Sequence, residues 1–218
     1  MGWFSNFTSS SIGRKFLMGI TGLFLVTFIA VHLLINSFSL VSAELFNAGS
    51  HFMATNPLIQ AMQYVLALGF IAHIAMGIVL TIRNNAARPV KYAMNKPGEN
   101  SNFASRSMIL TGVLVMLFLF LHLKDFFVPI KFDHGSYGTD YDLLVLVFSN
   151  PVYVVIYIVA FILLGIHLFH GFQSAFQTIG VNHPKYTPAI KFLGVLYCVV
   201  VALGFSAIAL FHFFNSMN

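Results

Sequence analysis

The sequence contains few charged residues and a single cysteine. Only 8% of its 218 residues are charged, whereas a water-soluble domain usually carries about a quarter. This scarcity argues against an ordinary soluble enzyme and against an intrinsically disordered chain, because both need a well-hydrated surface. One cysteine, Cys198, allows no internal disulfide, no C-x-x-C-H haem attachment and no iron–sulfur cluster held by cysteines.

Apolar residues make up 58% of the chain and are concentrated in five long runs. The runs cover approximately residues 16–36, 58–82, 107–123, 152–176 and 192–214, and none of them contains Asp, Glu, Lys or Arg. A bilayer-spanning helix needs about 20 apolar residues and satisfies its own backbone hydrogen bonds in lipid. The third run is short and is expected to continue through Lys124 and Asp125 toward Pro129. The sequence therefore predicts an all-α integral membrane bundle of five transmembrane helices, forming a single domain over residues 1–218.

The basic residues predict how this bundle is oriented. Nine of the 11 Lys and Arg residues fall on the side that holds the N-terminus: Arg14, Lys15, Arg83, Arg88, Lys91, Lys96, Arg106, Lys185 and Lys191. The other side holds only Lys124 and Lys131, together with five of the six acidic residues. Because short cytoplasmic loops are rich in Lys and Arg, we expect the N-terminus in the cytoplasm and the C-terminus outside. The net charge of +5 then reflects topology, and nothing else supports nucleic-acid binding.

The segments between the runs are short. Residues 1–15 have no obvious small-residue cleavage site, so the first run is interpreted as a retained helix and not as a signal peptide. The segment 37–56 is long enough for a short interfacial helix around residues 43–53. No segment has the composition of a separate soluble domain, so chemistry in the water phase is expected to come from a partner.

Five of the nine histidines lie within the first four runs: His32, His73, His122, His167 and His170. An ionisable residue inside a membrane span is a candidate functional residue. The remaining four are interpreted as interfacial or solvated imidazoles: His51, His134, His183 and His212. A single intramembrane histidine could simply form a hydrogen bond with a neighbouring helix. One histidine on each of four consecutive helices is harder to explain in this way.

The intramembrane histidines fall at two depths. With a rise of 1.5 Å per residue, His32 and His122 lie roughly 24–27 Å from the N-terminal edge, and His73 and His167 roughly 12–15 Å from it. The four therefore form an outer pair, His32 with His122, and an inner pair, His73 with His167. Two neutral imidazoles facing each other across a bundle are what a bis-histidine haem iron requires. The sequence thus predicts two haem b groups, with these four residues as axial ligands of the iron.

A weak internal repeat accompanies the histidines. Thr-Gly precedes His-Leu at the same spacing in the first run (Thr21-Gly22, His32-Leu33) and in the third (Thr111-Gly112, His122-Leu123). The second and fourth runs share the pattern His-x-x-x-Gly, at His73 with Gly77 and at His167 with Gly171. A glycine one turn from a ligand lets a flat macrocycle approach the backbone. This spacing favours His167 over His170 as the ligand in the fourth run.

Basic side chains near the two depths are candidates for binding the haem propionates. They are Arg14, Lys15, Arg83 and Arg106 for the inner haem and Lys124 for the outer one, although topology alone also accounts for them. The 25 Phe and nine Met residues are mostly interpreted as lipid-facing or core side chains.

Over nearly its full length the chain resembles a known family, the five-helix, di-haem cytochrome b subunit of bacterial succinate:quinone oxidoreductases and fumarate reductases. The resemblance rests on the block from Gly22 to Leu33, the loop at residues 46–53 (Phe-Asn-Ala-Gly-Ser-His-Phe-Met), His73 with Gly77, Gly112 with His122, and the segment 167–176. The family's ligand positions fall on His32, His73, His122 and His167.

The resemblance implies a membrane anchor that is not itself the catalytic subunit. It implies a flavoprotein subunit and an iron–sulfur subunit docked on the cytoplasmic face of the bacterial inner membrane. Electrons from succinate would pass through two haems to a quinone, with menaquinone expected. Some di-haem relatives carry a membrane carboxylate implicated in proton transfer. Because no Asp or Glu occurs in the five runs, such a role is not expected here, and His51 and Glu44 are candidates for the quinone site.

Two other interpretations remain open from the sequence. One is a membrane cytochrome b that anchors a hydrogenase, a formate dehydrogenase or another dehydrogenase. Such a protein would have the same histidines, and the soluble subunits that copurify with it would distinguish it from a succinate dehydrogenase anchor. The other is a haem-free transporter or proton channel that uses the histidines as proton relays. This interpretation predicts a colourless protein. A purely structural anchor, with ligands but no electron flow, is distinguished by the kinetics of reoxidation by quinone.

Overall fold

The computed structural model describes Gly2, Phe7 and residues 10–86, 103–133 and 136–217. In this part of the chain every regular element is helical, and five helices are long and apolar enough to cross a membrane. They cover Ser11–Leu40, Pro57–Ala86, Ser107–Phe132, Pro151–Thr178 and Thr187–Ser216. The five spans predicted from the sequence are therefore confirmed, each extended by a few residues.

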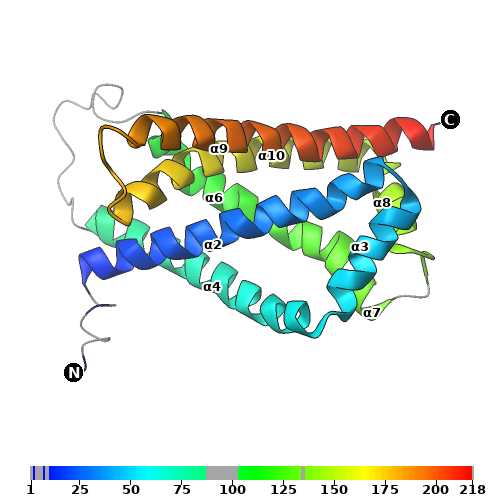
Figure 1. Ribbon diagram of the computed structural model, residues 1–218, viewed down its shortest axis with the longest axis horizontal. Helices are drawn as coiled ribbons and strands as arrows, with labels where there is room; N and C mark the ends of the chain where they lie inside the picture. The colour runs from blue at the N-terminus through cyan, green and yellow to red at the C-terminus, as the bar shows by residue number, and fades with distance from the viewer. Residues whose placement is uncertain (1, 3–6, 8–9, 87–102, 134–135, 218) are drawn as a thin grey trace.

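Successive spans run in opposite directions, so the chain termini lie at opposite ends of the bundle (Figure 1). We call these the N-terminal end and the C-terminal end. The spans are α2 (Ser11–Ser37), α4 (Pro57–Ala86), α6 (Phe103–His122) with its continuation, α9 (Pro151–Thr178) and α10 (Thr187–Ser216). The C-terminal end is closed by η1 (Phe38–Leu40), α3 (Ala43–Thr55), α7 (Val128–Phe132) and α8 (Asp140–Phe148).

Polar side chains fix where several helices begin. The Ser10 hydroxyl accepts a hydrogen bond from Gly13 N at the start of α2, and Ser42 accepts one from Leu45 N at the start of α3. Asn150 caps α9 in the same way, followed by Pro151 in the first turn. Such caps satisfy backbone N–H groups that have no partner within the helix. The interfacial helix predicted around residues 43–53 is confirmed as α3.

The third span continues through Lys124 and Asp125 to Phe132, so the expected extension toward Pro129 is confirmed. After α6 it continues through a π-helical segment, η2 (Leu123–Phe127), and then α7. Pro129 follows directly; it cannot donate a backbone hydrogen bond and crowds the preceding turn, a common cause of irregular helix geometry. As a result Asp125 lies inside the span and is buried. The expectation that no carboxylate lies within the spans is therefore wrong at this position.

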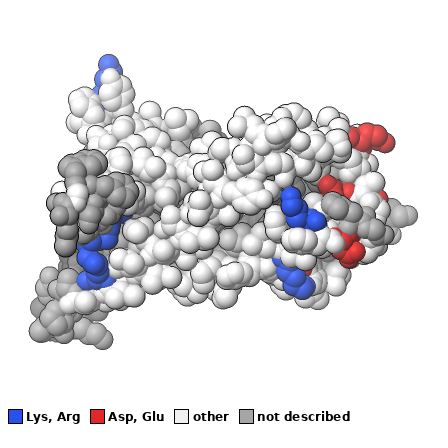
Figure 2. Space-filling model, turned by 90° about the horizontal axis from the view of Figure 1, so that it is seen from below, with Lys and Arg blue, Asp and Glu red and all other residues white. Residues whose placement is uncertain are grey.

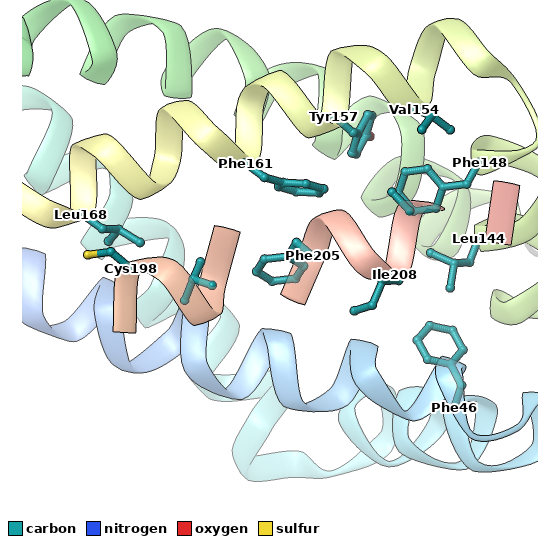
Figure 3. Close-up of a cluster of buried hydrophobic side chains, with 12 residues drawn as sticks. Phe46, Leu144, Phe148, Val154, Tyr157, Phe161, Leu168, Cys198, Phe205 and Ile208 are labelled. Carbon is teal, nitrogen blue, oxygen red and sulfur yellow. The ribbon is translucent and has the colours of Figure 1, made fainter. Parts of the chain in front are cut away.

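The protein core is unevenly distributed among the spans. Most of its fully buried apolar side chains come from α8, α9 and α10, including Phe148, Phe161 and Phe205, whereas α4 contains no buried residue (Figure 3). The helix α10 packs along α9 and α2, and the Tyr197 hydroxyl donates a 2.6 Å hydrogen bond to the Val26 carbonyl. The inward faces of α2, α4 and α6 are thus less completely covered by protein than those of α9 and α10.

Charged side chains lie at the two ends of the molecule and leave its middle uncharged (Figure 2). Among the described residues, Arg14, Lys15, Arg83, Lys185 and Lys191 lie toward the N-terminal end. Three basic residues of the predicted N-terminal side and one histidine lie outside the described residues: Arg88, Lys91, Lys96 and His134. The side chain of Arg106 is not described either. The uncharged middle matches the hydrocarbon region of a bilayer, about 30 Å thick.

Candidate functional site

The structure brings four histidines together in two pairs, each formed by two different helices. The rings of His32 (α2) and His122 (α6) have centroids 5.7 Å apart and planes at 87°. The rings of His73 (α4) and His167 (α9) are 6.4 Å apart, with planes at 81°. These are the pairs expected from depth. We call them the C-terminal pair and the N-terminal pair, after the end of the bundle that each lies nearer.

The spacing of both pairs fits an iron held between the rings. Metal–imidazole bonds are about 2 Å long, so two rings that share one metal have centroids roughly 6 Å apart. Among the described residues, no cluster of three or more His, Cys, Asp or Glu could hold a bare metal ion. A metal that brings most of its own ligands, as haem iron does, needs only two. The residues present therefore fit haem better than a protein-only metal site.

In the N-terminal pair, each imidazole contacts a threonine on the neighbouring helix. His73 Nδ1 lies 3.4 Å from Thr21 Oγ1, and His167 Nδ1 lies 3.4 Å from Thr111 Oγ1. Each threonine hydroxyl donates its proton to a carbonyl one turn earlier in its own helix, at 2.8 and 3.0 Å. Its oxygen is then an acceptor for Nδ1–H, which leaves a lone pair on Nε2. This is the tautomer that a metal-ligating histidine needs.

The glycines of the repeat allow this close approach. A Cβ atom on Gly22 would lie 3.4 Å from His73 Cε1, and one on Gly112 would lie 3.3 Å from His167 Cε1. Both contacts are tighter than most real Cβ contacts, so larger side chains would push the rings away. The Thr-Gly motif thus supports the histidine of the adjacent helix, not the histidine that follows it in its own run.

The second glycine pattern has a different environment from the one expected. The atom nearest to a Cβ on Gly77 is the methyl carbon of Met18, and for Gly171 it is that of Met108, both at 3.7 Å. Residues 18, 21, 22 and 32 therefore correspond to residues 108, 111, 112 and 122 in their contacts as well as in sequence. The helix pair α2–α4 repeats the helix pair α6–α9.

The C-terminal pair is surrounded mainly by aromatic rings. His32 stacks on Phe28 at 5.3 Å, and His122 lies 5.3 Å from Phe126 and 6.2 Å from Tyr157. The buried Nδ1 of His122 has no hydrogen-bond partner among the described residues. A buried imidazole nitrogen without a partner is costly, so this ring is held by packing and by whatever its other nitrogen binds.

The other histidines are placed as follows. The Nε2 of His170 lies 3.2 Å from Ser174 Oγ, and it is His167 that faces His73. His51 and His183 are exposed, as predicted. His212 is only 1% exposed, with Nε2 3.0 Å from Ser39 Oγ, so the prediction of a solvated imidazole is wrong there. The predicted fifth run already extended past this residue to position 214; what the sequence did not indicate is that Ser39 of η1 lies against the imidazole.

The loop motif at residues 46–53 joins elements at the C-terminal end. Phe46 is buried, Asn47 Oδ1 accepts a 3.0 Å hydrogen bond from Tyr141 N, and the Ser50 hydroxyl donates to Asp140. These contacts dock α3 onto the start of α8. The motif therefore has a packing role.

The two candidates for a quinone site on α3, Glu44 and His51, are both exposed. Hydrogen bonds from its own backbone N–H and from the Ser42 hydroxyl hold the pKa of the Glu44 carboxyl below its usual value. Glu44 thus interacts with the first turn of α3, where a negative charge is stabilised by the helix dipole.

A buried carboxylate that the sequence did not predict lies beside the C-terminal pair. Asp125 Oδ2 accepts a 2.9 Å hydrogen bond from the Tyr157 hydroxyl, and Oδ1 lies 3.2 Å from Lys124 Nζ. The Asp125 side chain is 5% exposed and that of Lys124 is 69% exposed. The continuation of the helix through this acidic residue was expected, but its burial beside Tyr157 was not.

At the N-terminal end, Arg14 is the buried member of the basic cluster, with 9% of its surface exposed. Lys15 is exposed on the same helix, and Arg83 is exposed in the last turn of α4. Charged side chains at the border of the apolar region, at the same end of the bundle as the N-terminal pair, suit the carboxylates of a haem.

No protein-family model and no solved structure matches the chain. A curated relative does: the succinate dehydrogenase cytochrome b558 subunit of Bacillus subtilis (strain 168) is 24% identical over 186 residues, which cover 84% of this chain and 85% of that protein. The resemblance drawn from the histidines and motifs is thereby confirmed, and a location as a multi-pass protein of the bacterial inner membrane fits it. Over most of its length, the chain is similar to a cytochrome b subunit of succinate dehydrogenase.

Proposed function

We propose that this chain is the haem b-carrying membrane anchor of a succinate:menaquinone oxidoreductase. In this role it passes electrons between an iron–sulfur subunit and the quinone and takes no part in succinate oxidation itself. The observation that carries the proposal is the pair of facing histidines at each of two levels. A transporter has no need for imidazoles matched in this way.

The two levels suit electron transfer in series. His73 touches Gly22, which precedes His32 by ten residues on the same helix, so the two pairs are about 15 Å apart along the bundle. Two redox groups at this spacing divide the roughly 30 Å hydrocarbon layer into shorter steps. When bound, each haem supplies one-electron chemistry, and the axial imidazoles and their burial tune its potential.

The chain's own residues hold and orient these groups. Thr21 and Thr111 keep the N-terminal imidazoles in the tautomer with Nε2 free, and the aromatic side chains around the C-terminal pair exclude water. Arg14, Lys15 and Arg83 are placed to bind the propionates of the N-terminal haem, and Lys124 those of the other.

The excess of basic residues at the N-terminal end supports a cytoplasmic location for that end. A flavoprotein subunit and an iron–sulfur subunit then dock there, and the C-terminal end faces the outside. In this orientation His73 and His167 would hold the haem nearer to the iron–sulfur subunit, and His32 and His122 would hold the haem nearer to the outer face.

The test is the haem content of the chain purified in detergent from haem-sufficient cells. We expect about two low-spin b haems per polypeptide in reduced-minus-oxidised spectra. Single His→Ala changes at positions 32, 73, 122 and 167 should each remove one haem, whereas His51→Ala and His183→Ala, both at exposed positions, serve as matched controls. A folded protein without haem would contradict the proposal, and copurification of subunits other than the flavoprotein and iron–sulfur pair would reassign the complex.

A further inference from the structure

Two neighbouring pockets lie on the surface of the bundle between the third span and α9. The first, of about 300 Å³, is at the C-terminal end and has four polar or charged residues on its wall: Lys124, Asp125, Asn150 and Tyr153. The second, of about 370 Å³, is lined only by apolar residues of α6 and α9. Its residues Leu121 and Ile156 lie one helical turn from Lys124 and Tyr153 of the first. The two pockets therefore form one groove, polar at one end and apolar along its length, which we call the α6–α9 groove.

The length of the α6–α9 groove matches one leaflet of a bilayer. Lys124 follows Leu114 by ten positions on one wall, and Leu163 follows Tyr153 by ten positions on the other. At 1.5 Å per residue each wall is about 15 Å long, which is half of the roughly 30 Å hydrocarbon layer. The polar end of the groove lies where the uncharged middle of the molecule meets its charged end (Figure 2). An acyl chain can therefore lie along the apolar part while its head group occupies the polar pocket.

The polar pocket offers both a positive and a negative group. Lys124 Nζ lies 3.2 Å from Asp125 Oδ1, and the two side chains are 69% and 5% exposed. An ammonium has three donors and a carboxylate about four acceptor sites, so each can bind a further group, even though Asp125 also accepts a hydrogen bond from Tyr157. Asn150 uses its Oδ1 to cap α9, which leaves its amide NH₂ as a donor, and the Tyr153 hydroxyl beside Lys124 is another.

We propose that the α6–α9 groove binds a zwitterionic phospholipid with a primary ammonium, of the phosphatidylethanolamine type. Its phosphate accepts hydrogen bonds from Lys124, Tyr153 and Asn150, and its ammonium donates to Asp125. One acyl chain lies along the apolar part of the groove. An anionic head group without an ammonium would place a second negative charge beside Asp125, and a choline head group has no N–H to donate, so both fit the pocket less well.

The test uses the full chain in phosphatidylcholine nanodiscs that contain a small fraction of phosphatidylethanolamine with a photoreactive diazirine in one acyl chain. Mass spectrometry identifies the labelled peptides. We expect label within residues 114–121 and 155–163, and we expect unlabelled phosphatidylethanolamine to displace it about tenfold more effectively than phosphatidylglycerol, as for one charge-assisted interaction. Label spread evenly over all five spans would show ordinary boundary lipid and overturn the site. Equal displacement by phosphatidylglycerol, or displacement by an isoprenoid chain but not by phosphatidylethanolamine, would overturn the proposed ligand.

A groove-filling variant tests the apolar part. Val159 lines the groove and is 51% exposed, so Val159→Trp can fill the groove without entering the protein core. It should lower labelling of the α6 and α9 peptides about tenfold. Val200→Trp is the matched control, because Val200 is 50% exposed on α10, and it should leave this labelling unchanged. Labelling that is undiminished by Val159→Trp overturns the groove as the binding site.

A second variant tests the head-group contacts without filling the groove. Tyr153→Phe removes one donor to the phosphate, so unlabelled phosphatidylethanolamine should displace the probe about tenfold less effectively. Tyr64→Phe, at an exposed position on α4, is the control and should leave the displacement unchanged. Lys124 is kept, because a haem propionate would use the same amine, whereas Tyr153 and Val159 have no part in the proposed haem sites. Unchanged displacement in Tyr153→Phe overturns the head-group contact.

Discussion

The two histidine pairs occupy equivalent places in an internal repeat but have different surroundings. In the N-terminal pair, both rings contact a threonine at 3.4 Å and both lie against a glycine, so the two halves are nearly identical. In the C-terminal pair, His32 has Asn36 one turn away, whereas the corresponding position after His122 is Phe126. The repeated threonine and glycine contacts are consistent with two histidines that hold one haem between them. The departures lie on the α6 side, where the π-helical segment also lies.

The largest effect is expected from closing the space beside an N-terminal ring. In Gly22→Val the new side chain would begin 3.4 Å from His73 Cε1 and displace the imidazole. We expect loss of the N-terminal haem with retention of the other, measured as haem per polypeptide and by the remaining absorption band. Gly112→Val should have the same effect through His167.

Gly77→Ala is the control for this prediction. Its new methyl group would lie 3.7 Å from the flexible end of Met18, an ordinary contact, so two haems should remain. Equal haem loss in the Gly77 and Gly22 variants would show that the repeat does not assign separate roles to its two glycine patterns.

The C-terminal pair should respond to a change that the N-terminal pair does not feel. Tyr157→Phe removes the 2.9 Å hydrogen bond to Asp125 and leaves a buried carboxylate oxygen without its partner. The free energy of unfolding should fall by about 1–3 kcal/mol, seen as a lower thermal midpoint in detergent. The spectrum of the C-terminal haem should shift, and that of the N-terminal haem should not.

Tyr197→Phe is the matched control, because Tyr197 donates to the Val26 carbonyl and contacts neither pair. It should also lower the thermal midpoint but leave both haem spectra unchanged. A spectral shift of the same size in both variants would mean that general loosening, and not the contact with His122, is responsible.

Much of this comparison could be predicted from the sequence, for identifiable reasons. The spans follow from runs of apolar residues, and the pairing of the histidines follows from a helical rise that is the same in every span. The roles of Thr21 and Gly22 could not be derived, because they act on a ring of another helix. Which helices are neighbours is decided by packing, and a single sequence does not reveal it.

The errors have a common physical origin at the C-terminal end. The burial of Asp125 and of His212 was not predicted, because polar residues near the end of a span are usually solvated. In the structure, η1, α3 and α8 cover this end. The Tyr157 hydroxyl of α9 donates a hydrogen bond to Asp125, and Ser39 Oγ lies 3.0 Å from His212 Nε2. A polar residue can be buried wherever a neighbouring element supplies a partner, and α8 itself was not predicted.

A smaller effect should show that the two halves of the N-terminal pair are equivalent. Thr21→Val and Thr111→Val each remove the acceptor for a histidine Nδ1–H and keep the side-chain shape. A histidine that donates this hydrogen bond is a more basic ligand, which favours the oxidised metal, so its loss should raise the potential. We expect about 20–40 mV for either variant, equivalent to a weak hydrogen bond, and no change for the C-terminal haem. Redox titration followed at the absorption band of each haem measures the two potentials. Unequal shifts in the two variants would show that the two halves of the N-terminal pair are not equivalent.

The smallest effect concerns α8, which has no counterpart in the repeat and helps to close the C-terminal end. Thr139 and Asp142 form a capping box, and hydrogen bonds from the Thr139 side chain and backbone hold the pKa of the Asp142 carboxyl below its usual 3.8. A lowered pKa contributes stability that is present above 3.8 and is lost as the pH falls through the lower value of the folded state. Asp142→Asn should therefore lower the thermal midpoint slightly at neutral pH, and the difference from the unmodified protein should shrink in acid. The haem content of both histidine pairs should stay the same. A variant that lost stability equally at neutral and acidic pH would show that the side chain acts by packing and not by its charge.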